Sequence, residues 1–408
     1  MEEQKGPKKT VLMVDQGLSF GGALIVLLSI ARNLPDDYRP VVVSAIKGDL
    51  DSWVDTKGIV THSCIPSFTY IGRFKWSKRI SAMPSRFLRR VLNLFLSMFE
   101  IVLNMGYIFN IYKIIKSQNV DVVHANNSIY ALIAASIARK PCVWHIHGVV
   151  TSNPSFLHKL LSYNVTKYIA ISRLVAESAI AHDYSQKKID VLHNPVADQF
   201  LLDGPSCEQK LRARFGIVKG DFVIAIFGRV IKWKGQRELV KAFIHAGFDK
   251  NVKLMLVGDS SEGFADTYLD NIKQIAQDHD VGDQLLYTGF IKNVHQIYDI
   301  VDVAVHASIE PEPFGLVVIE AMASAVPVIA SNLGAPSEVI TDGVNGLLVD
   351  PNDNDGFAFA LKRVVTNHRL RSSLTEQGSL TIRDRFLPSN YANKLAEIYQ
   401  ESIEASVK

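Results

Sequence analysis

Short apolar runs rich in β-branched residues alternate with longer stretches of helical spacing along nearly the whole chain. The runs predict strands over 11–14, 41–44, 120–124, 143–145 and 168–170 in the first half, and over 222–227, 253–257, 285–288, 303–306 and 328–330 in the second. Helices are predicted between them, for example over 23–33, 236–246 and 316–323. This alternation predicts an α/β fold whose parallel sheets are covered by helices on both faces.

The predicted strands fall into two sets separated by residues 194–205, where two prolines and a glycine interrupt the pattern. A chain of 408 residues is long enough for two domains. We expect a first doubly wound domain over 1–197 and a second over 198–387, with a cleft between the carboxyl ends of their strands. Small ligands bind at such ends, so the loops that follow strands are the places to look for chemistry.

The composition narrows the function classes without identifying one. Apolar residues make up 48% and charged residues 21%, and the formal charge is +3, which argues against a basic nucleic-acid-binding protein. The three cysteines lie far apart and form no CxxC pair, so neither a disulfide framework nor a zinc site is predicted. With no signal-peptide pattern at the first residues, we expect a cytoplasmic protein.

Residues 71–112 differ from the rest of the chain. The segment 71–90 carries seven Lys and Arg and no acidic residue, and a long apolar run follows over 91–112. A helix there would gather its polar members, Asn93, Ser97, Glu100 and Asn104, into one narrow stripe. Three interpretations stay open: a core helix whose polar stripe meets water, a basic edge that rests on an anionic membrane surface, and a transmembrane span. Glu100 and the polar stripe argue against the span.

The most specific pattern is EPEPFGLVVIEAMASAVPVIAS, which begins at Glu310. It places a turn containing Gly315 between a strand and a helix, and the N-terminus of that helix suits a phosphate group. Glu320 lies one turn inside the helix with its side chain tilted back toward the N-terminus, where a carboxylate can accept hydrogen bonds from a ribose diol. Glu312 lies in the loop before it. The alternative is that Glu312 caps the helix and Glu320 is a solvated helix residue.

A second pattern, FGRVIKWKGQREL, follows the strand predicted over 222–227. Arg229 and Lys234 stand five positions apart in the loop. Both can reach a diphosphate, Arg as a planar fork and Lys as a point charge. The alternative is a solvated basic loop without a ligand.

Two weaker patterns lie in the first half of the chain. Gly21 and Gly22 open the helix after the first strand, and paired glycines there permit a ligand to approach the backbone closely. His147, followed by Gly148, comes directly after the strand 143–145, where an imidazole can bond a sugar hydroxyl or move a proton. The alternatives are a tight turn and a buried, hydrogen-bonded histidine, and the second fits His145 better because it lies within the strand.

With these residues in view, the chain resembles the family 4 glycosyltransferases, retaining enzymes of the GT-B fold with two Rossmann-like domains. The spacing from Glu312 to Glu320 is similar to that family's E-x7-E motif, and Arg229 with Lys234 to its cationic pair. Gly21 and Gly22 resemble its N-terminal glycine loop, and His147 its N-domain histidine. Further agreement comes from the segments DVVHANN, IAISRLV, HNPV and GVNGLLV.

The resemblance implies that the second domain binds a nucleotide-diphosphate sugar, and it assigns roles to residues. Glu320 would hold the ribose, Arg229 and Lys234 the diphosphate, and Gly289 with Phe290 would lie near the base. Contacts to the donor sugar would come from Glu312 and from the backbone at Phe314, Gly315 and Leu316. Gly21 and Gly22 would also bind the donor. His147 would lie near the donor sugar and the acceptor.

The resemblance also implies that a last helix within 388–408 packs back on the first domain. It implies that Asn194 marks a hinge, where Pro195 replaces the glycine that often follows, which leaves the flexibility of the hinge in question. It further implies retention of anomeric configuration.

Cations and a helix N-terminus can stabilise a leaving diphosphate, so we expect a metal-independent enzyme without a cofactor. The acidic residues Asp353 and Asp355 lie late in the chain and are better interpreted as a helix cap than as a metal site. We expect a glycan or lipid-linked glycan as the acceptor, in surface polysaccharide or glycolipid assembly. A sugar-nucleotide epimerase and a non-catalytic nucleotide-sugar-binding subunit are the alternatives.

Overall fold

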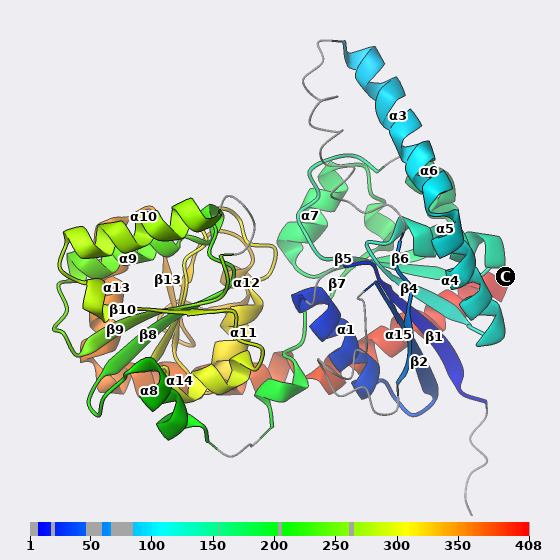
Figure 1. The fold of residues 1–408 in the computed structure, drawn as a ribbon. Helices are drawn as coiled ribbons and strands as arrows, with labels where there is room; N and C mark the ends of the chain where they lie inside the picture. Colours follow the sequence, from blue (N-terminus) through cyan, green and yellow to red (C-terminus); the bar gives the residue numbers. More distant parts are fainter. Residues whose placement is uncertain are drawn as a thin grey trace, which may run out of the picture. The chain divides into compact units, whose positions relative to one another are not determined.

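A computed structural model describes residues 7–17, 21–45, 59–66, 85–154, 156–202, 206–260 and 265–407. The chain divides into two compact units (Figure 1). The first contains Met1–Ile171, Val175–Leu192 and Ser389–Lys408, and the second contains Ser172–Leu174 and His193–Pro388. Each unit has its own parallel sheet and its own core.

The described part of the first unit contains a seven-stranded sheet of order β3-β2-β1-β4-β5-β6-β7 in which all neighbours are parallel. Its strands are β1 (Lys9–Asp15), β2 (Tyr38–Ser44), β3 (Val60–Ser63), β4 (Val122–Asn126), β5 (Cys142–Ile146), β6 (Val165–Ala170) and β7 (Ile189–Val191). The side chains of β1 from Val11 to Val14 are fully buried, as expected for a central strand covered on both faces.

The second unit contains, among its described residues, a six-stranded parallel sheet of order β10-β9-β8-β11-β12-β13. Its strands are β8 (Phe222–Phe227), β9 (Val252–Val257), β10 (Leu285–Gly289), β11 (Val303–His306), β12 (Val328–Ser331) and β13 (Leu347–Val349). The order changes direction beside β8, the first strand of the unit, so the loops after β8 and β11 open at a topological switch point.

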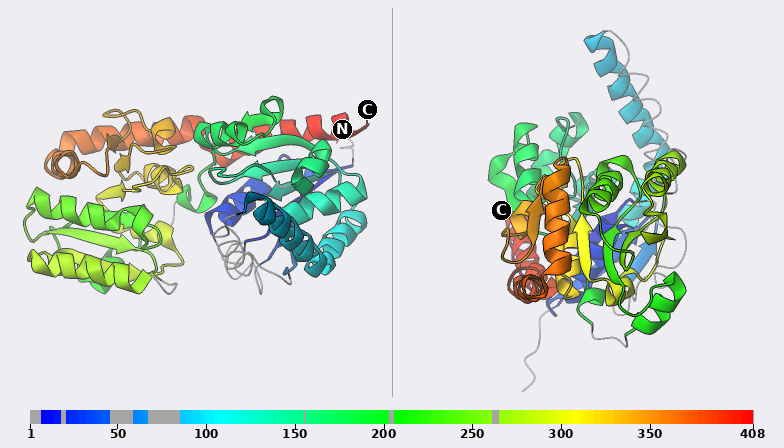
Figure 2. Two further views of the ribbon diagram at one scale, coloured as in Figure 1. Left: turned by 90° about the horizontal axis from the view of Figure 1, so that it is seen from above. Right: turned by 90° about the vertical axis from the view of Figure 1, so that its left-hand side faces the viewer.

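Helices cover both faces of each sheet (Figures 1 and 2). In the first unit they are α1 (Gly22–Asn33), α3 (Arg86–Leu103), α4 (Met105–Ser117), α5 (Ile129–Ala138), α6 (Phe156–Leu161), α7 (Arg173–Ala181) and α15 (Pro388–Val407). In the second they are α8 (Glu208–Phe215), α9 (Gln236–Ala246), α10 (Ala265–Asp278), α11 (Leu316–Ala323), α12 (Pro336–Val339), α13 (Asn354–Thr366) and α14 (His368–Arg385). Asp353 is the N-cap of α13, where its carboxylate accepts the N–H of Gly356 at 3.0 Å, which confirms the predicted cap.

The strands predicted from the apolar runs are all present. β8 and β11 have the predicted bounds, whereas β4 begins two residues later than predicted. The sequence analysis missed β3, β7 and β13, which are all short strands at an edge of a sheet. An edge strand is paired on one side only and needs fewer apolar residues, so its pattern is weak.

The last helix, α15, belongs to the first unit although it follows the second in sequence. The hydroxyl of Tyr38 donates to the carbonyl of Ala396 at 2.8 Å, and Thr166 donates to Ser402 at 2.7 Å. Three side chains on one face of α15 are buried: Tyr391, Leu395 and Tyr399. This helix therefore completes the core of the first unit.

The segment predicted as one long helix is two helices, because the chain breaks at Asn104 between α3 and α4. Glu100 and Asn104 are buried and bonded to Tyr130, whose hydroxyl donates to Glu100 at 2.7 Å and accepts the Asn104 amide at 3.0 Å. The interpretation in which the polar stripe meets water is therefore wrong at these two positions. The reason is that a partner 30 residues away in sequence satisfies the carboxylate inside the protein.

Apolar side chains of α3 and the start of α4 are exposed instead, and the amino-terminal half of α3 projects beyond the other elements of its unit (Figures 1 and 2). None of the helices in the described ranges has the length and apolar character needed to cross a membrane. Residues 71–84 of the basic segment lie outside the described residues.

Candidate functional site

The candidate site of the second unit is built where β11 gives way to α11. Gly315 is the N-cap of α11 with φ of 84°, a left-handed conformation that favours glycine. A glycine has no side chain to cap the helix, so the first backbone N–H groups of α11, beginning at Leu316, donate no hydrogen bond to an N-cap side chain. Phe314 is buried beside them and fixes the turn. The helix end thus presents donors and the positive end of its dipole to an anion.

Glu312, in the same loop, is held by three donors on a single oxygen. Its Oε2 atom accepts from Lys234 Nζ at 2.7 Å, Ser308 Oγ at 2.8 Å and His306 Nε2 at 3.2 Å. Burial by itself raises the pKa of Glu312, but the hydrogen bond from His306 and the charge of Lys234 lower it to about 2. Glu312 is therefore ionised and fixed at neutral pH.

His306 and Ser308 were not identified from the sequence. They stand two residues apart at the carboxyl end of β11, and both side chains are buried against Glu312. Because Glu312 only accepts, the Nε2 atom of His306 donates to it, and the buried Nδ1 atom has no hydrogen-bond partner among the described residues. Their spacing, two polar residues two positions apart at the end of a strand, could have identified them as site residues.

Lys234 reaches Glu312 because its loop lies directly against the end of β11. The next residue, Gly235, has φ of 73°, and a Cβ atom built there would lie 1.8 Å from the carbonyl oxygen of Ala307. Only glycine allows this approach. The ammonium group also lies 4.1 Å from the centre of the Trp233 ring. Backbone packing and an aromatic face thus place the cation beside the acid.

Arg229, the other predicted cation, is exposed. Within the described ranges its guanidinium has no hydrogen bond or ion pair, whereas its backbone carbonyl accepts from the Gln236 amide at 2.8 Å. The structure therefore brings Lys234 and Glu312 together, and it leaves Arg229 in the same loop with its charge unpaired.

Glu320 differs from Glu312 in its hydrogen-bond partners and in its pKa. It lies on α11, and burial raises the pKa of its carboxyl to about 7. Its carboxylate accepts no hydrogen bond from the described residues. Within the described part of the chain, the nearby Tyr298 hydroxyl is buried without a hydrogen-bond partner, and burial and the charge of Glu320 raise the pKa of that phenol. An acceptor and a donor are thus both left unsatisfied, which is expected where a ligand binds.

Gly289 and Phe290 lie at the carboxyl end of β10, at the same edge of the parallel sheet as the loops after β8 and β11. Gly289 has φ of 66°, and Phe290 is 60% exposed. An exposed aromatic ring at this edge offers a flat apolar face to a ligand.

Two predicted elements belong to the first unit. Gly21 is the N-cap of α1 with an extended backbone, and Gly22 is its first residue; the preceding residues 18–20 lie outside the described ranges. His147 follows β5, and burial lowers its pKa to about 4. Its Nε2 atom is buried without a hydrogen-bond partner among the described residues, whereas both ring nitrogens of His145 are bonded. The prediction that His145 is the satisfied core histidine is confirmed.

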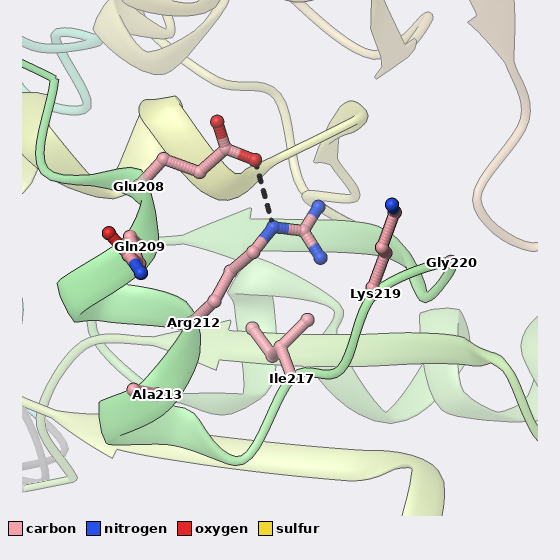
Figure 3. A pocket seen from close by; sticks show the side chains of 7 residues that line it. All are labelled: Glu208, Gln209, Arg212, Ala213, Ile217, Lys219 and Gly220. Atoms are coloured by element: carbon pink, nitrogen blue, oxygen red, sulfur yellow. Dashed lines mark hydrogen bonds and ion pairs between the residues drawn. The ribbon is translucent and has the colours of Figure 1, made fainter.

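A surface depression of about 470 Å³ lies elsewhere in the second unit (Figure 3). It is lined by Glu208, Gln209, Arg212, Ala213, Ile217, Lys219 and Gly220. Figure 3 shows Arg212 turned toward Glu208, with which it pairs at 3.1 Å. These residues precede β8, so they lie at the amino edge of the sheet, opposite the loops that carry Lys234 and Glu312. In the described ranges, no three His, Cys, Asp or Glu side chains are arranged to hold a metal ion.

The chain is similar to known glycosyltransferases in both halves. Residues 208–381 match the family model described as glycosyl transferases group 1, and residues 20–200 match that of Glycosyltransferase Family 4. The N-acetyl-alpha-D-glucosaminyl L-malate synthase of Bacillus anthracis is 24% identical over 303 residues, 71% of this chain and 77% of that protein. The capsular polysaccharide biosynthesis glycosyltransferase CapM of Staphylococcus aureus is 27% identical over 267 residues, 61% of this chain and 65% of that protein.

A solved structure supports the same fold. The structure of HepE from Anabaena in complex with UDP and glucose is 22% identical in sequence and has a TM-score of 0.73. The alignment covers 96% of this chain and 99% of that one.

Proposed function

The chain belongs to the family 4 glycosyltransferases and has their GT-B fold of two Rossmann-like domains, and we propose that it transfers a sugar from a nucleotide-diphosphate sugar to an acceptor hydroxyl with retention of configuration. The acceptor is a glycan or lipid-linked glycan in surface polysaccharide or glycolipid assembly. The carrying observation is the Lys234–Glu312 pair beside the uncapped N-terminus of α11.

The second unit binds the donor in this proposal. Lys234 and Arg229 hold the diphosphate, together with the first N–H groups of α11. Glu320, whose carboxylate has no hydrogen-bond partner among the described residues, receives the hydroxyls of the ribose. The exposed ring of Phe290 lies with Gly289 against the base.

The transferred sugar is bound by Glu312 and by the backbone of Phe314, Gly315 and Leu316. In the first unit, Gly21, Gly22 and His147 are assigned to the transferred sugar and the acceptor. A neutral imidazole with an unpartnered Nε2 suits a hydroxyl group.

The chemistry follows from charge. As the bond between the anomeric carbon and the phosphate oxygen breaks, the leaving nucleoside diphosphate gains negative charge, which Lys234, Arg229 and the α11 dipole stabilise without a metal. The acceptor oxygen bonds to the anomeric carbon on the same face. Its proton passes to an oxygen of the leaving phosphate, so atoms and charge balance.

The deciding experiment incubates the purified chain with UDP, GDP and ADP sugars and candidate acceptors, and follows the products by NMR. We expect a product that retains the donor's anomeric configuration, at a rate unchanged by EDTA. An inverted product would overturn retention, and strict dependence on manganese would overturn metal independence. Interconversion of donor sugars without an acceptor would favour the epimerase, and donor binding without any product would favour the binding subunit.

A second proposal concerns where the reaction takes place: the exposed face of α3 and early α4 rests on an anionic membrane surface. Its exposed apolar side chains recur at alternating steps of three and four and so form one stripe: Leu88, Val91, Phe95, Met98, Val102, Met105 and Phe109. Phe95 is 70% exposed, although it is among the largest apolar side chains of the helix. An apolar stripe of this length on a soluble domain indicates a partner.

Charge decides which partner the stripe fits. The segment 71–90, which leads into α3, carries seven cations and no acidic residue. If a second copy docked on the stripe, two such segments would come together and their positive charges would repel each other. Anionic lipid headgroups would attract the same charges. A surface of anionic lipid is therefore the occupant we propose, and it would bring the enzyme to a lipid-linked acceptor.

Flotation with lipid vesicles tests this assignment. We expect the chain to float with vesicles containing phosphatidylglycerol at low salt, less at high salt, and not with pure phosphatidylcholine. The double variant Phe95→Ser/Val102→Ser should lose flotation, whereas Phe359→Ser, which changes an equally exposed ring on the second unit, should not. Failure of the wild-type chain to bind at low salt, or a stable dimer by ultracentrifugation that Phe95→Ser/Val102→Ser abolishes, would overturn the proposal.

A further inference from the structure

A chain of hydrogen bonds runs through the core of the first unit beside His147. His124 of β4 and His145 of β5 are fully buried, and His124 Nε2 lies 3.1 Å from His145 Nδ1. Two tyrosines of α15 close its ends: the Tyr399 hydroxyl lies 2.8 Å from His124 Nδ1, and the Tyr391 hydroxyl lies 3.4 Å from His145 Nε2. These four groups are separated by up to 275 residues in sequence.

Asp15 and Asn126 fix the direction of this chain. The two carboxylate oxygens of Asp15 receive the N–H of Gly17 at 3.0 Å and the amide Nδ2 of Asn126 at 3.4 Å. Since both oxygens take donors, the Asn126 side chain turns its Oδ1 atom to His124 Nε2, at 3.2 Å. An amide oxygen only accepts, so His124 carries its proton on Nε2.

The remaining protons follow from this one. With Nε2 protonated, the neutral His124 has a bare Nδ1, which accepts the Tyr399 hydroxyl. His145 Nδ1 faces the proton of His124 and is therefore bare, so His145 carries its own proton on Nε2 and donates it to Tyr391. One proton on each ring satisfies every nitrogen. Burial, and the charge that His147 would carry if protonated, lower the pKa of His124 to about 3 and hold the pKa of His145 well below its usual value, which agrees with two neutral rings.

His147 rests on the end of this chain. Its ring centroid lies 3.9 Å from that of His145, so the bonded and immobile His145 ring forms the platform on which the His147 ring packs. Unlike His124 and His145, His147 keeps a buried Nε2 atom without a partner in the described part of the chain. Every ring nitrogen of His124 and His145 is thus bonded, whereas among the described residues nothing bonds the His147 Nε2 atom, which the proposed function assigns to a sugar hydroxyl.

We propose that Asn126, His124, His145, Tyr391 and Tyr399 are positioning residues, which hold the ring of His147 in one orientation so that its Nε2 atom meets the sugar or acceptor hydroxyl. The proposal rests on the proposed function for the role of His147. It gives the last helix of the chain, through Tyr391 and Tyr399, a part in the reaction beyond packing. None of the five touches the reacting atoms in this assignment.

The first test does not depend on activity. Long-range ¹H–¹⁵N spectra of ¹⁵N-histidine-labelled protein report which ring nitrogen carries the proton. We expect His124 and His145 each to show a proton on Nε2 and a bare Nδ1 at pH 7, and His147 to be neutral. A proton on Nδ1 of His124 would overturn the assigned direction, whether or not the chain is a transferase.

The second test uses Tyr391→Phe, which removes the acceptor of the His145 proton and keeps the ring. We expect kcat to fall about tenfold with the donor KM within about twofold, because the loss of one hydrogen bond displaces a group that acts in the transition state. The control is Tyr168→Phe, since Tyr168 bonds the buried His158 at 3.0 Å in the same unit but outside the network. We expect it to keep the wild-type kcat.

The outcomes separate the two proposals. If Tyr391→Phe and Tyr168→Phe lower the unfolding temperature equally and both keep the wild-type kcat, the network is structural and the positioning role is wrong, although the transferase function stands. If His147→Ala itself keeps the wild-type kcat, the role proposed for His147 is wrong while the NMR assignment stands.

Discussion

The two units bring polar side chains together in opposite ways. In the second unit a full ion pair, Lys234 with Glu312, is held by further donors, and the pKa of the acid falls to about 2. In the first unit, three histidines lie in contact and burial lowers all their pKa values, so none is charged at neutral pH. The second unit thus offers fixed charges, and the first unit offers uncharged hydrogen-bonding groups of defined orientation.

This difference matches the parts of the proposed substrate. A diphosphate that gains charge as it leaves is stabilised by fixed cations, and a mobile or neutral group would do this poorly. A sugar hydroxyl carries no charge and is recognised by the direction of a donor or acceptor. The comparison therefore predicts that variants in the second unit change the reaction through charge, and those in the first unit through geometry.

The largest effect is expected from Lys234→Ala. Loss of a group that stabilises the leaving diphosphate lowers kcat by about 10²–10³-fold, as removal of one such donor does in other enzymes. Steady-state kinetics with the donor sugar identified in the NMR product assay measures the effect. Lys219→Ala, which removes an exposed cation of the same unit, should leave kcat unchanged. Equal activity of both variants would remove the ionic site from the mechanism.

Glu320→Gln tests the acid whose pKa lies far above that of Glu312. A carboxyl with a folded-state pKa of about 7 against an ordinary value of 4.5 binds more protons when folded, so it destabilises the fold increasingly as pH rises from 4.5 to 7. The variant should therefore gain up to about 3 kcal/mol in free energy of unfolding over the wild type at pH 8, and nothing at pH 4.

Urea unfolding at the two pH values measures this gain, and Glu338→Gln is a control from the same unit, because the pKa of Glu338 is lowered. An equal response at both pH values would contradict a raised pKa at Glu320. The variant should also weaken UDP binding if the carboxylate holds the ribose.

Most of the fold could be predicted from the sequence because a run of apolar residues marks each central strand. β8 is an apolar run that ends before Gly228, and β11 begins with three buried apolar residues. The buried side chains of α9 and α11 show helical spacing. The edge strands β3 and β7 are partly exposed and too short to show a pattern.

Site residues could be predicted only where the neighbouring sequence places them, as at the end of a strand or in the loop that follows it. Lys234 and Glu312 could be placed from strand ends, but their contact depends on Gly235 lying against Ala307, which no local pattern reveals. Tyr391 and Tyr399 were missed because their partners are 246 and 275 residues away. The orientation of α3 was misjudged for the same reason, since Tyr130 satisfies Glu100 from another helix.

A smaller effect is expected from Ser308→Ala, which removes one of the three donors to Glu312. The carboxylate keeps Lys234 and His306, so we expect a loss of about tenfold in kcat and a rise in the pKa of Glu312. A depressed pKa stabilises the fold above pH 4.5 and this contribution is lost as pH falls toward 2, so the variant should unfold at a higher pH than the wild type during acid titration. The control is Ser337→Ala, because the Ser337 hydroxyl donates to the Gly334 carbonyl at 2.7 Å and has no bond to Glu312. We expect this variant to change neither kcat nor the pH of acid unfolding.

The smallest effect is expected from Arg229→Ala. This variant distinguishes a cation that attracts the diphosphate through water from one that binds it directly. Arg229 is exposed and unpaired within the described ranges, so its attraction for a diphosphate acts through water and is screened by salt. We expect UDP affinity to fall several-fold at 50 mM NaCl and hardly at all at 500 mM, measured by calorimetry. Tyr391→Phe, in the neutral network, should change kcat by the same factor at both salt concentrations. A loss from Arg229→Ala that does not depend on salt would mean that its guanidinium binds at short range like Lys234. The contrast between an exposed, screened cation and a partly buried one in this site would then be wrong.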